Sequence, residues 1–191
     1  MAKTQFQNKG FEVVKGFIHA PFASYFRNYF SLIAQNEPNL TGDRQAPNSR
    51  ALYGDPAFDT LMACSTHSVE QIVGKNLIPQ YTYARIYNNG SVLQRHLDRA
   101  ECEYSVTLCL GGRYDKQWPI WLKDYDGNEH EVPLDEGDCV VYSGTKLEHW
   151  REEFEGDKQY QVFMHYVDSE GEYKDRIYDG RPNLGLQPKR K

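Results

Sequence analysis

The chain has 191 residues with 39% hydrophobic and 14% aromatic residues, and its formal net charge at pH 7 is -5. This length suits one folded domain and is short for two, so we expect a single domain over residues 1–191. The acidic balance argues against general nucleic-acid binding, and no apolar run is long enough to span a membrane. The N-terminus lacks the apolar core of a signal peptide, which predicts a soluble protein that is cytoplasmic or otherwise intracellular.

The first part of the chain predicts one strand and two helices. Residues 10–18 have the composition of an opening strand, and apolar residues recur at helical spacing through residues 21–34. Residues 36–55 are rich in Asn, Pro, Gly and Asp and predict a mobile loop. Pro at position 56 favours a helix start there, which completes a helical support over residues 1–76.

The hydrophobic period changes to two from Leu77 onward, which is typical of strands. Turn signals such as Asn88-Asn89-Gly90 and Asp126-Gly127 separate about eight short strands. These strands are expected near residues 81–87, 91–98, 104–110, 118–122, 139–142, 149 onward and 160–167. The pattern predicts an α+β, mainly β fold, with a β-core over 77–168, helices packed outside it, and a C-terminal tail over 169–191.

His96 and Asp98 are separated by one residue, so on a strand both side chains point to the same face. His149 stands at the start of a later strand-like run and is the candidate for a third ligand. Two imidazoles and one carboxylate form the facial set of non-haem Fe(II) oxygenases, which leaves positions open for other ligands. From residue types alone, a metal site and a surface His–Asp pair beside an unrelated capping histidine are equally favoured.

Four motifs in a fixed order separate these alternatives. Residues 87–98 read Tyr-x-x-Gly-x-x-Leu-x-x-His-x-Asp, residues 106–112 end in a Gly pair, and residues 132–142 lead to His149. Together with the opening Val-Val-x-x-Phe-Ile of residues 13–18, this set resembles the 2-oxoglutarate/Fe(II)-dependent oxygenases of the prolyl 4-hydroxylase type. The resemblance extends over nearly the whole chain and favours the metal-site reading.

The resemblance implies a double-stranded β-helix (jelly-roll) core with the N-terminal helices packed on its major sheet. It implies that His96, Asp98 and His149 are the catalytic metal ligands for Fe(II), with 2-oxoglutarate and O2 as co-substrates and ascorbate as an optional reductant. The expected activity is that of a dioxygenase, most simply a hydroxylase, acting on prolyl residues of a peptide or protein or on a small molecule.

The far carboxylate of 2-oxoglutarate needs a cation, and two residues compete for this role. Lys158 stands at the family's distance after His149, but Gln159 occupies the position where the family often has a basic residue. Arg151 follows His149 by two residues, so it faces the same side of a straight strand, and its guanidinium can bind a carboxylate through two hydrogen bonds. The sequence leaves Arg151 and Lys158 equally favoured.

Two further residues could contact the co-substrate. Arg85 is a third and weaker candidate for the cation, and Tyr87 occupies the family's tyrosine position, where it could donate a hydrogen bond or simply fill the barrel. His165 lies within a strand and is expected to be a barrel histidine with protein partners rather than a ligand.

Two other classes of protein remain as alternatives. One is a non-catalytic jelly-roll binding or assembly module, which an intact ligand set disfavours. The other is a cupin-type metal enzyme without a 2-oxoglutarate requirement, which the His-x-Asp pattern disfavours because cupins usually have His-x-His. The loops at residues 36–55 and 99–103 and the C-terminal tail are expected to select the substrate, but none carries a recognisable code.

Overall fold

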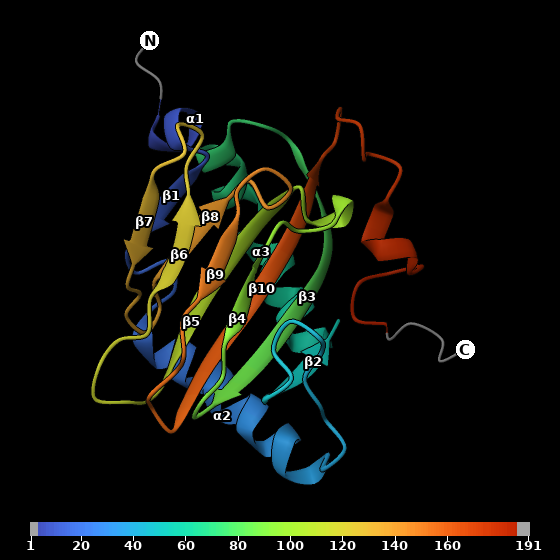
Figure 1. The fold of residues 1–191 in the computed structure, drawn as a ribbon. Coiled ribbons are helices and arrows are strands. Elements are labelled where there is room, and N and C mark those ends of the chain that lie inside the picture. Colours follow the sequence, from blue (N-terminus) through green and yellow to red (C-terminus); the bar gives the residue numbers. More distant parts are fainter. Residues whose placement is uncertain (1–3, 187–191) are drawn as a thin grey trace.

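The computed structural model describes residues 4–186 and contains two antiparallel sheets with helices on one side (Figure 1). The larger sheet has the order β1-β8-β5-β10-β3-β2, and the smaller has the order β4-β9-β6-β7. The strands within residues 4–186 are β1 (Phe11–Val14), β2 (Ser49–Tyr53), β3 (Leu77–Asn88), β4 (Leu93–His96), β5 (Tyr104–Arg113), β6 (Ile120–Lys123), β7 (Glu129–Val132), β8 (Cys139–Tyr142), β9 (His149–Arg151) and β10 (Lys158–Asp168).

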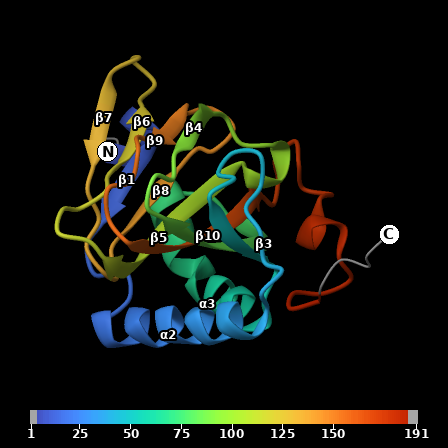
Figure 2. The ribbon, with the colours of Figure 1, turned by 60° about the horizontal axis from the view of Figure 1, so that its bottom comes forward.

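The helices are α1 (Gln5–Lys9), α2 (Ala20–Asn36) and α3 (Pro56–Val73), with short 3-10 turns η1 (Ala100–Cys102) and η2 (Ile177–Gly180). Figure 2 shows α2 and α3 lying across the outer face of the larger sheet. Phe26 and Phe30 of α2 pack on Phe58 of α3 with ring centroids 5.4 and 5.9 Å apart. Burying each ring contributes roughly 1.5–3 kcal/mol, so this aromatic face fixes the helices on the sheet as predicted.

Strand β10 shows how the larger sheet separates two environments. Alternate side chains of β10 enter the hydrophobic core beneath the helices, and these are Tyr160, Val162, Met164 and Tyr166. The intervening side chains face the space between the two sheets, where Gln161 contacts Thr107 and His165 contacts Ser105. The polar interior of the molecule is therefore built from one face of the same strands whose other face forms the core.

Several boundaries differ from the expectations. The prediction of a loop throughout residues 36–55 is wrong, because Ser49–Tyr53 forms β2 and pairs with β3. This edge strand alternates only weakly between buried and exposed residues, and β3 supplies the backbone hydrogen-bonding partners that it needs. Strand β5 continues through Gly111 and Gly112, since a bulge opposite β10 absorbs the positive φ of Gly111. From Leu77 onward the described part of the chain has eight strands, β3–β10, as expected, and α3 runs unbroken from Pro56 to Val73.

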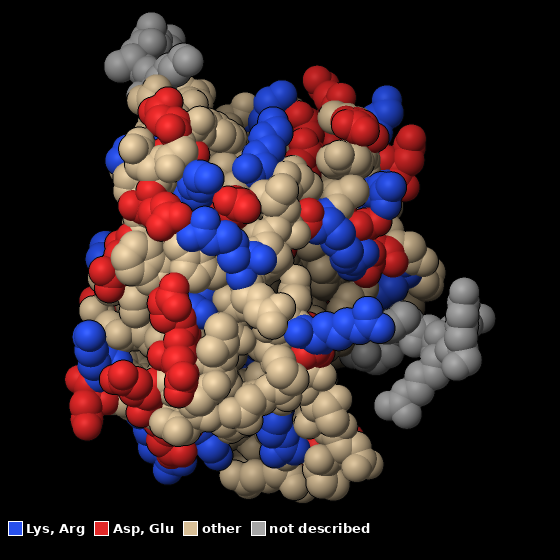
Figure 3. Space-filling view, viewed as in Figure 1, with Lys and Arg blue, Asp and Glu red and all other residues tan. Residues whose placement is uncertain are grey.

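The face in Figure 3 carries interleaved acidic and basic side chains, so neither sign of charge dominates it. Within residues 4–186, no helix has the length and apolar character needed to cross a membrane.

The C-terminal segment is tied to the rest of the fold by a buried ion pair. The side chains of Arg181 and Asp59 are 2% and 1% exposed, and Arg181 Nη1 lies 2.8 Å from Asp59 Oδ2. Arg181 Nη2 also donates to the carbonyl of Gln80, and Asp59 Oδ1 accepts from the Thr82 backbone and hydroxyl. The segment after β10 is thus joined to both α3 and β3.

We expect Arg181→Met to lower the free energy of unfolding by about 3–5 kcal/mol, because it leaves the Asp59 carboxylate buried without its cation. Urea denaturation measures this change. Arg176→Met is the matched control, since the Arg176 side chain is 50% exposed in its pair with Glu101 and exposed pairs contribute at most about 1 kcal/mol. Equal effects of the two substitutions would contradict a structural role for the buried pair.

Candidate metal centre and adjoining cavity

The structure brings His96, Asp98 and His149 together at the ends of two neighbouring strands. His96 closes β4 and pairs directly with His149 at the start of β9. The Nε2 atoms of His96 and His149 lie 3.5 and 3.6 Å from Asp98 Oδ1, and the two rings are 4.2 Å apart between centroids. Because one ligand atom from each residue lies within 4.8 Å of the others, the set can hold a single metal ion.

Both imidazoles are oriented by the backbone. Nδ1 of His96 lies 2.7 Å from the Gln94 carbonyl, and Nδ1 of His149 lies 3.0 Å from the Leu147 carbonyl. A ring that donates from Nδ1 carries its lone pair on Nε2, and that atom faces Asp98 in both residues. This is the outer-shell arrangement that metal-binding histidines use, so the tautomer needed for a ligand is fixed without a metal.

Asp98 is held in place from its other oxygen. Its Oδ2 atom accepts a hydrogen bond from the Ser105 hydroxyl at 2.9 Å, and its backbone N–H donates to the Gly144 carbonyl. A Cβ at Gly144 would lie 2.5 Å from Asp98 Oδ2, so only glycine leaves room for the carboxylate. Burial would raise the pKa of Asp98, but the proximity of His149 and His96 holds this pKa well below its ordinary value.

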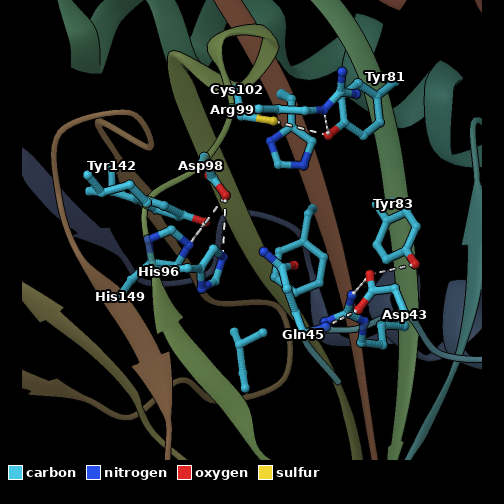
Figure 4. Close-up of a pocket in the computed structure, with 15 residues that line it drawn as sticks. Asp43, Gln45, Tyr81, Tyr83, His96, Asp98, Arg99, Cys102, Tyr142 and His149 are labelled. Carbon is cyan, nitrogen blue, oxygen red and sulfur yellow. Dashed lines mark hydrogen bonds and ion pairs between the residues drawn. The ribbon is translucent and has the colours of Figure 1, made fainter. Parts of the chain in front are cut away.

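The ligand set opens into a cavity of about 330 Å³ between the two sheets. Figure 4 shows His96, Asp98 and His149 on one side, with Asp43 and Tyr83 across from them on the side of β3. Tyr142 from β8 also lines the cavity, and its hydroxyl is 3.4 Å from His149 Nε2. The cavity can therefore admit a molecule to the exposed side of the three ligands.

Arg151 lies inside the barrel, on the same face of β9 as His149. Its side chain is fully buried, its guanidinium stands 4.8 Å from the centre of the Trp118 ring, and Nη1 donates to the Trp118 carbonyl. The Nε and Nη2 atoms have no hydrogen-bond partner, and no carboxylate within residues 4–186 forms an ion pair with it. Burial lowers the pKa of Arg151, as expected for a cation that lacks a neighbouring anion.

The unpartnered polar atoms of the interior share one chemical character. In the described part of the chain, five buried side-chain atoms lack a partner, and they are Arg85 Nε, Arg151 Nε, Arg151 Nη2, Gln159 Oε1 and Gln161 Nε2. Four of these atoms are donors and one is an acceptor. Buried donors are costly unless they are satisfied, so the interior is suited to an oxygen-rich, anionic molecule.

The other proposed contact residues fall in different places. Tyr87 is fully buried beside Trp118, with ring centroids 4.8 Å apart, and its hydroxyl accepts from Arg85. Lys158 lies at the start of β10, two residues before Tyr160, so both side chains belong to the same face of the strand, and Tyr160 faces the helices. Strand parity therefore puts Lys158 on the opposite side of the sheet from the cavity, while Gln159 faces the interior.

Some functional neighbours were not found from the sequence. Ser105 connects Asp98 to His165, whose Nδ1 lies 2.9 Å from the same hydroxyl, and Gly144 makes room for the carboxylate. Cys102 lies near Asp98 and His165 and donates to or accepts from the Tyr81 hydroxyl at 3.0 Å. The only sequence signal for Ser105 was its position at the start of the strand after Asp98, which does not single it out.

Replacing either ligand histidine, in His96→Ala or His149→Ala, should weaken Ni²⁺ binding by more than about 100-fold, since losing a direct ligand exceeds the cost of losing an outer-shell contact. Isothermal titration calorimetry measures this loss. His67→Ala is the control, because the His67 side chain is 82% exposed and distant in sequence from the set. Unchanged Ni²⁺ affinity in both histidine variants would contradict the assignment of a metal site to these residues.

No family model and no curated protein matches this sequence. Solved structures do match its fold. A Pseudomonas putida prolyl-4-hydroxylase superposes with a TM-score of 0.68 at 17% identity, covering 85% of this chain and 95% of that one. HygX from Streptomyces hygroscopicus, with nickel and 2-oxoglutarate bound, gives a TM-score of 0.67 at 17% identity, covering 88% and 89%.

A third similar structure is SnoK, a non-haem α-ketoglutarate-dependent carbocyclase from nogalamycin biosynthesis. Its TM-score is 0.72 at 11% identity, and the match covers 96% of this chain and 91% of that one. Each of these matches covers most of the present chain. The chain therefore has the fold of the 2-oxoglutarate/Fe(II) oxygenases, including those of prolyl 4-hydroxylase type, as its sequence motifs predicted.

Proposed function

We propose that this protein is an Fe(II)- and 2-oxoglutarate-dependent dioxygenase whose metal is held by His96, Asp98 and His149. The observation that carries the proposal is the pairing of this ligand set with an excess of unpartnered donors in the adjoining interior. In a metal-binding module without a co-substrate, no ligand would satisfy the buried, unpaired guanidinium, and this group would only lower the stability of the fold. The strands that follow one another along the core alternate mostly between the two sheets, which supports a double-stranded β-helix forming one catalytic domain.

Arg151 is the residue that we propose to bind the far carboxylate of 2-oxoglutarate. Its two unpartnered N–H groups match the two oxygens of a carboxylate, and charge-assisted pairs of this kind are among the stronger hydrogen bonds in proteins. Tyr87 and Arg151 both pack on the Trp118 ring, each 4.8 Å from its centre, so the Tyr87 hydroxyl can contribute to the same carboxylate contact. Lys158 is less suited, because strand parity directs it toward the helices.

The bound iron would supply the activation of O2, coupled to oxidation of 2-oxoglutarate to succinate and CO2, with ascorbate as an optional reductant. The chain's own contribution is to fix the ligands and exclude water. The backbone carbonyls of Gln94 and Leu147 hold the two rings, and Ser105 holds the carboxylate. With three protein ligands on one side, the remaining positions are left for the keto acid and O2.

We propose hydroxylation as the reaction and prolyl residues as the first substrate class to examine. The similar structures include a prolyl-4-hydroxylase and a carbocyclase, so one fold supports several oxidations and small-molecule substrates belong to the same proposal. The non-catalytic module and the cupin-type enzyme are the alternatives. Fe(II)-dependent formation of succinate from 2-oxoglutarate separates them, because neither alternative consumes the keto acid.

Arg151→Gln should raise the dissociation constant for 2-oxoglutarate by about 10- to 100-fold, since it removes a charge-assisted hydrogen-bonding pair. Titration of the Ni²⁺-loaded protein measures the constant, and retained Ni²⁺ affinity shows that the barrel is intact. Lys158→Gln is the matched control and should leave the constant unchanged. The reverse result, with only Lys158→Gln weakening the co-substrate, would assign the role to Lys158.

A further inference from the structure

Arg85 is a second buried arginine that the proposed chemistry does not use. It lies on β3, its side chain is 3% exposed, and it lines the same cavity as His96 and His149. Its Nη2 atom pairs with Asp43 Oδ2 at 2.5 Å and its Nη1 atom donates to the Tyr87 hydroxyl at 3.2 Å, while Nε has no partner. The cavity therefore contains a fixed cation with unused hydrogen-bonding capacity.

The partner of Arg85 is much more exposed than Arg85 itself. The Asp43 side chain is 39% exposed and belongs to the segment between α2 and β2, which has neither helix nor strand in residues 37–48. Asp43 also accepts from the Tyr83 hydroxyl at 3.0 Å and from the backbone N–H groups of Gln45 and Ala46. An acidic side chain from a loop thus pairs with a buried arginine that lines the cavity.

Charge balance shows what could replace Asp43, and this step rests on the proposed function. The two positive charges of Fe(II) and that of Arg151 offset the negative charges of Asp98 and of doubly ionised 2-oxoglutarate. Arg85 is then left with Asp43 as its only ion-pair partner in the described residues. Because an uncompensated buried charge is costly, a ligand that takes the place of Asp43 must itself be anionic.

We propose that Arg85 is a specificity-determining residue that binds a carboxylate group of the substrate, in the position that Asp43 occupies in this structure. The rings of Tyr83 and Phe163 lie 5.0 and 5.9 Å from the Arg85 guanidinium. These rings provide apolar walls beside the cation, so the substrate class is a carboxylic acid with an apolar body next to the acid group. The carboxylate binds through the planar fork of the guanidinium, which suits this geometry better than a lysine would.

Benzoate and benzamide are suitable probes, because they share an aromatic ring and differ in charge at the carboxyl position. The protein is first loaded with Ni²⁺ and saturated with 2-oxoglutarate, so that the metal and the Arg151 position are occupied. Asp43→Asn should then tighten benzoate binding by about tenfold or more relative to the unsubstituted protein, since it removes the competing carboxylate, and should leave benzamide binding unchanged.

Two further variants locate the binding site. Arg85→Gln in the Asp43→Asn background should abolish the gain, and Arg85→Lys should restore only part of it. Arg99→Gln in the same background is the matched control, because Arg99 lines the same cavity but pairs with Asp179 through two hydrogen bonds of 2.8 Å. It should retain the tightened benzoate binding.

Several outcomes would overturn the inference. They are absence of benzoate binding to Asp43→Asn, equal gains for benzoate and benzamide, or a gain that survives Arg85→Gln. Tight binding of the cation benzamidine to the unsubstituted protein, lost in Asp43→Asn, would instead make Asp43 the substrate contact and reject Arg85. Failure of the loading step, with no Ni²⁺ or 2-oxoglutarate bound, refutes the proposed function, whereas loaded protein that fails the benzoate comparison refutes only the substrate class.

Discussion

The pairing of β4 with β9 is the interaction on which the candidate site depends. It sets His96 opposite His149 and Leu93 opposite Arg151, so one short antiparallel contact aligns both the ligands and the buried cation. Strand geometry then positions the remaining groups. Residues two apart on β9 share the interior face, and Asp98 follows β4 closely enough to reach both imidazoles. The other strands mainly hold these two in position and close the space around them.

The polar interior that results lowers the stability of the fold. A guanidinium in the barrel without a paired carboxylate, and amide groups of Gln159 and Gln161 with unpartnered atoms, all carry desolvation costs. The aromatic core between α2, α3 and the larger sheet lies on the other side of the same strands and offsets those costs. Stability and ligand binding are thus divided between the two faces of one sheet, and an anionic ligand that satisfies the interior donors would also stabilise the fold.

The sequence predicted the architecture and the candidate ligand set better than it predicted the details. The change of hydrophobic period at Leu77 marked the sheet region, and motif order grouped His96, Asp98 and His149, which the structure brings together. Strand β2 was missed because an edge strand can form on the pairing groups of β3 without a strong alternation of its own. Ser105 and Gly144 could not be identified, since their importance comes from contacts with Asp98 made only after the chain has folded.

The choice between Arg151 and Lys158 shows why spacing alone was insufficient. Counting residues from His149 favoured Lys158, but the parity of β10 gives its interior position to Gln159, an uncharged residue. With Arg151 as the proposed anchor, the cation lies on β9 instead of the last strand, in the same three-residue segment as His149. A displacement of β9 would shift His149 and Arg151 together, so metal and co-substrate binding should be coupled more directly here than when the two groups lie on separate strands.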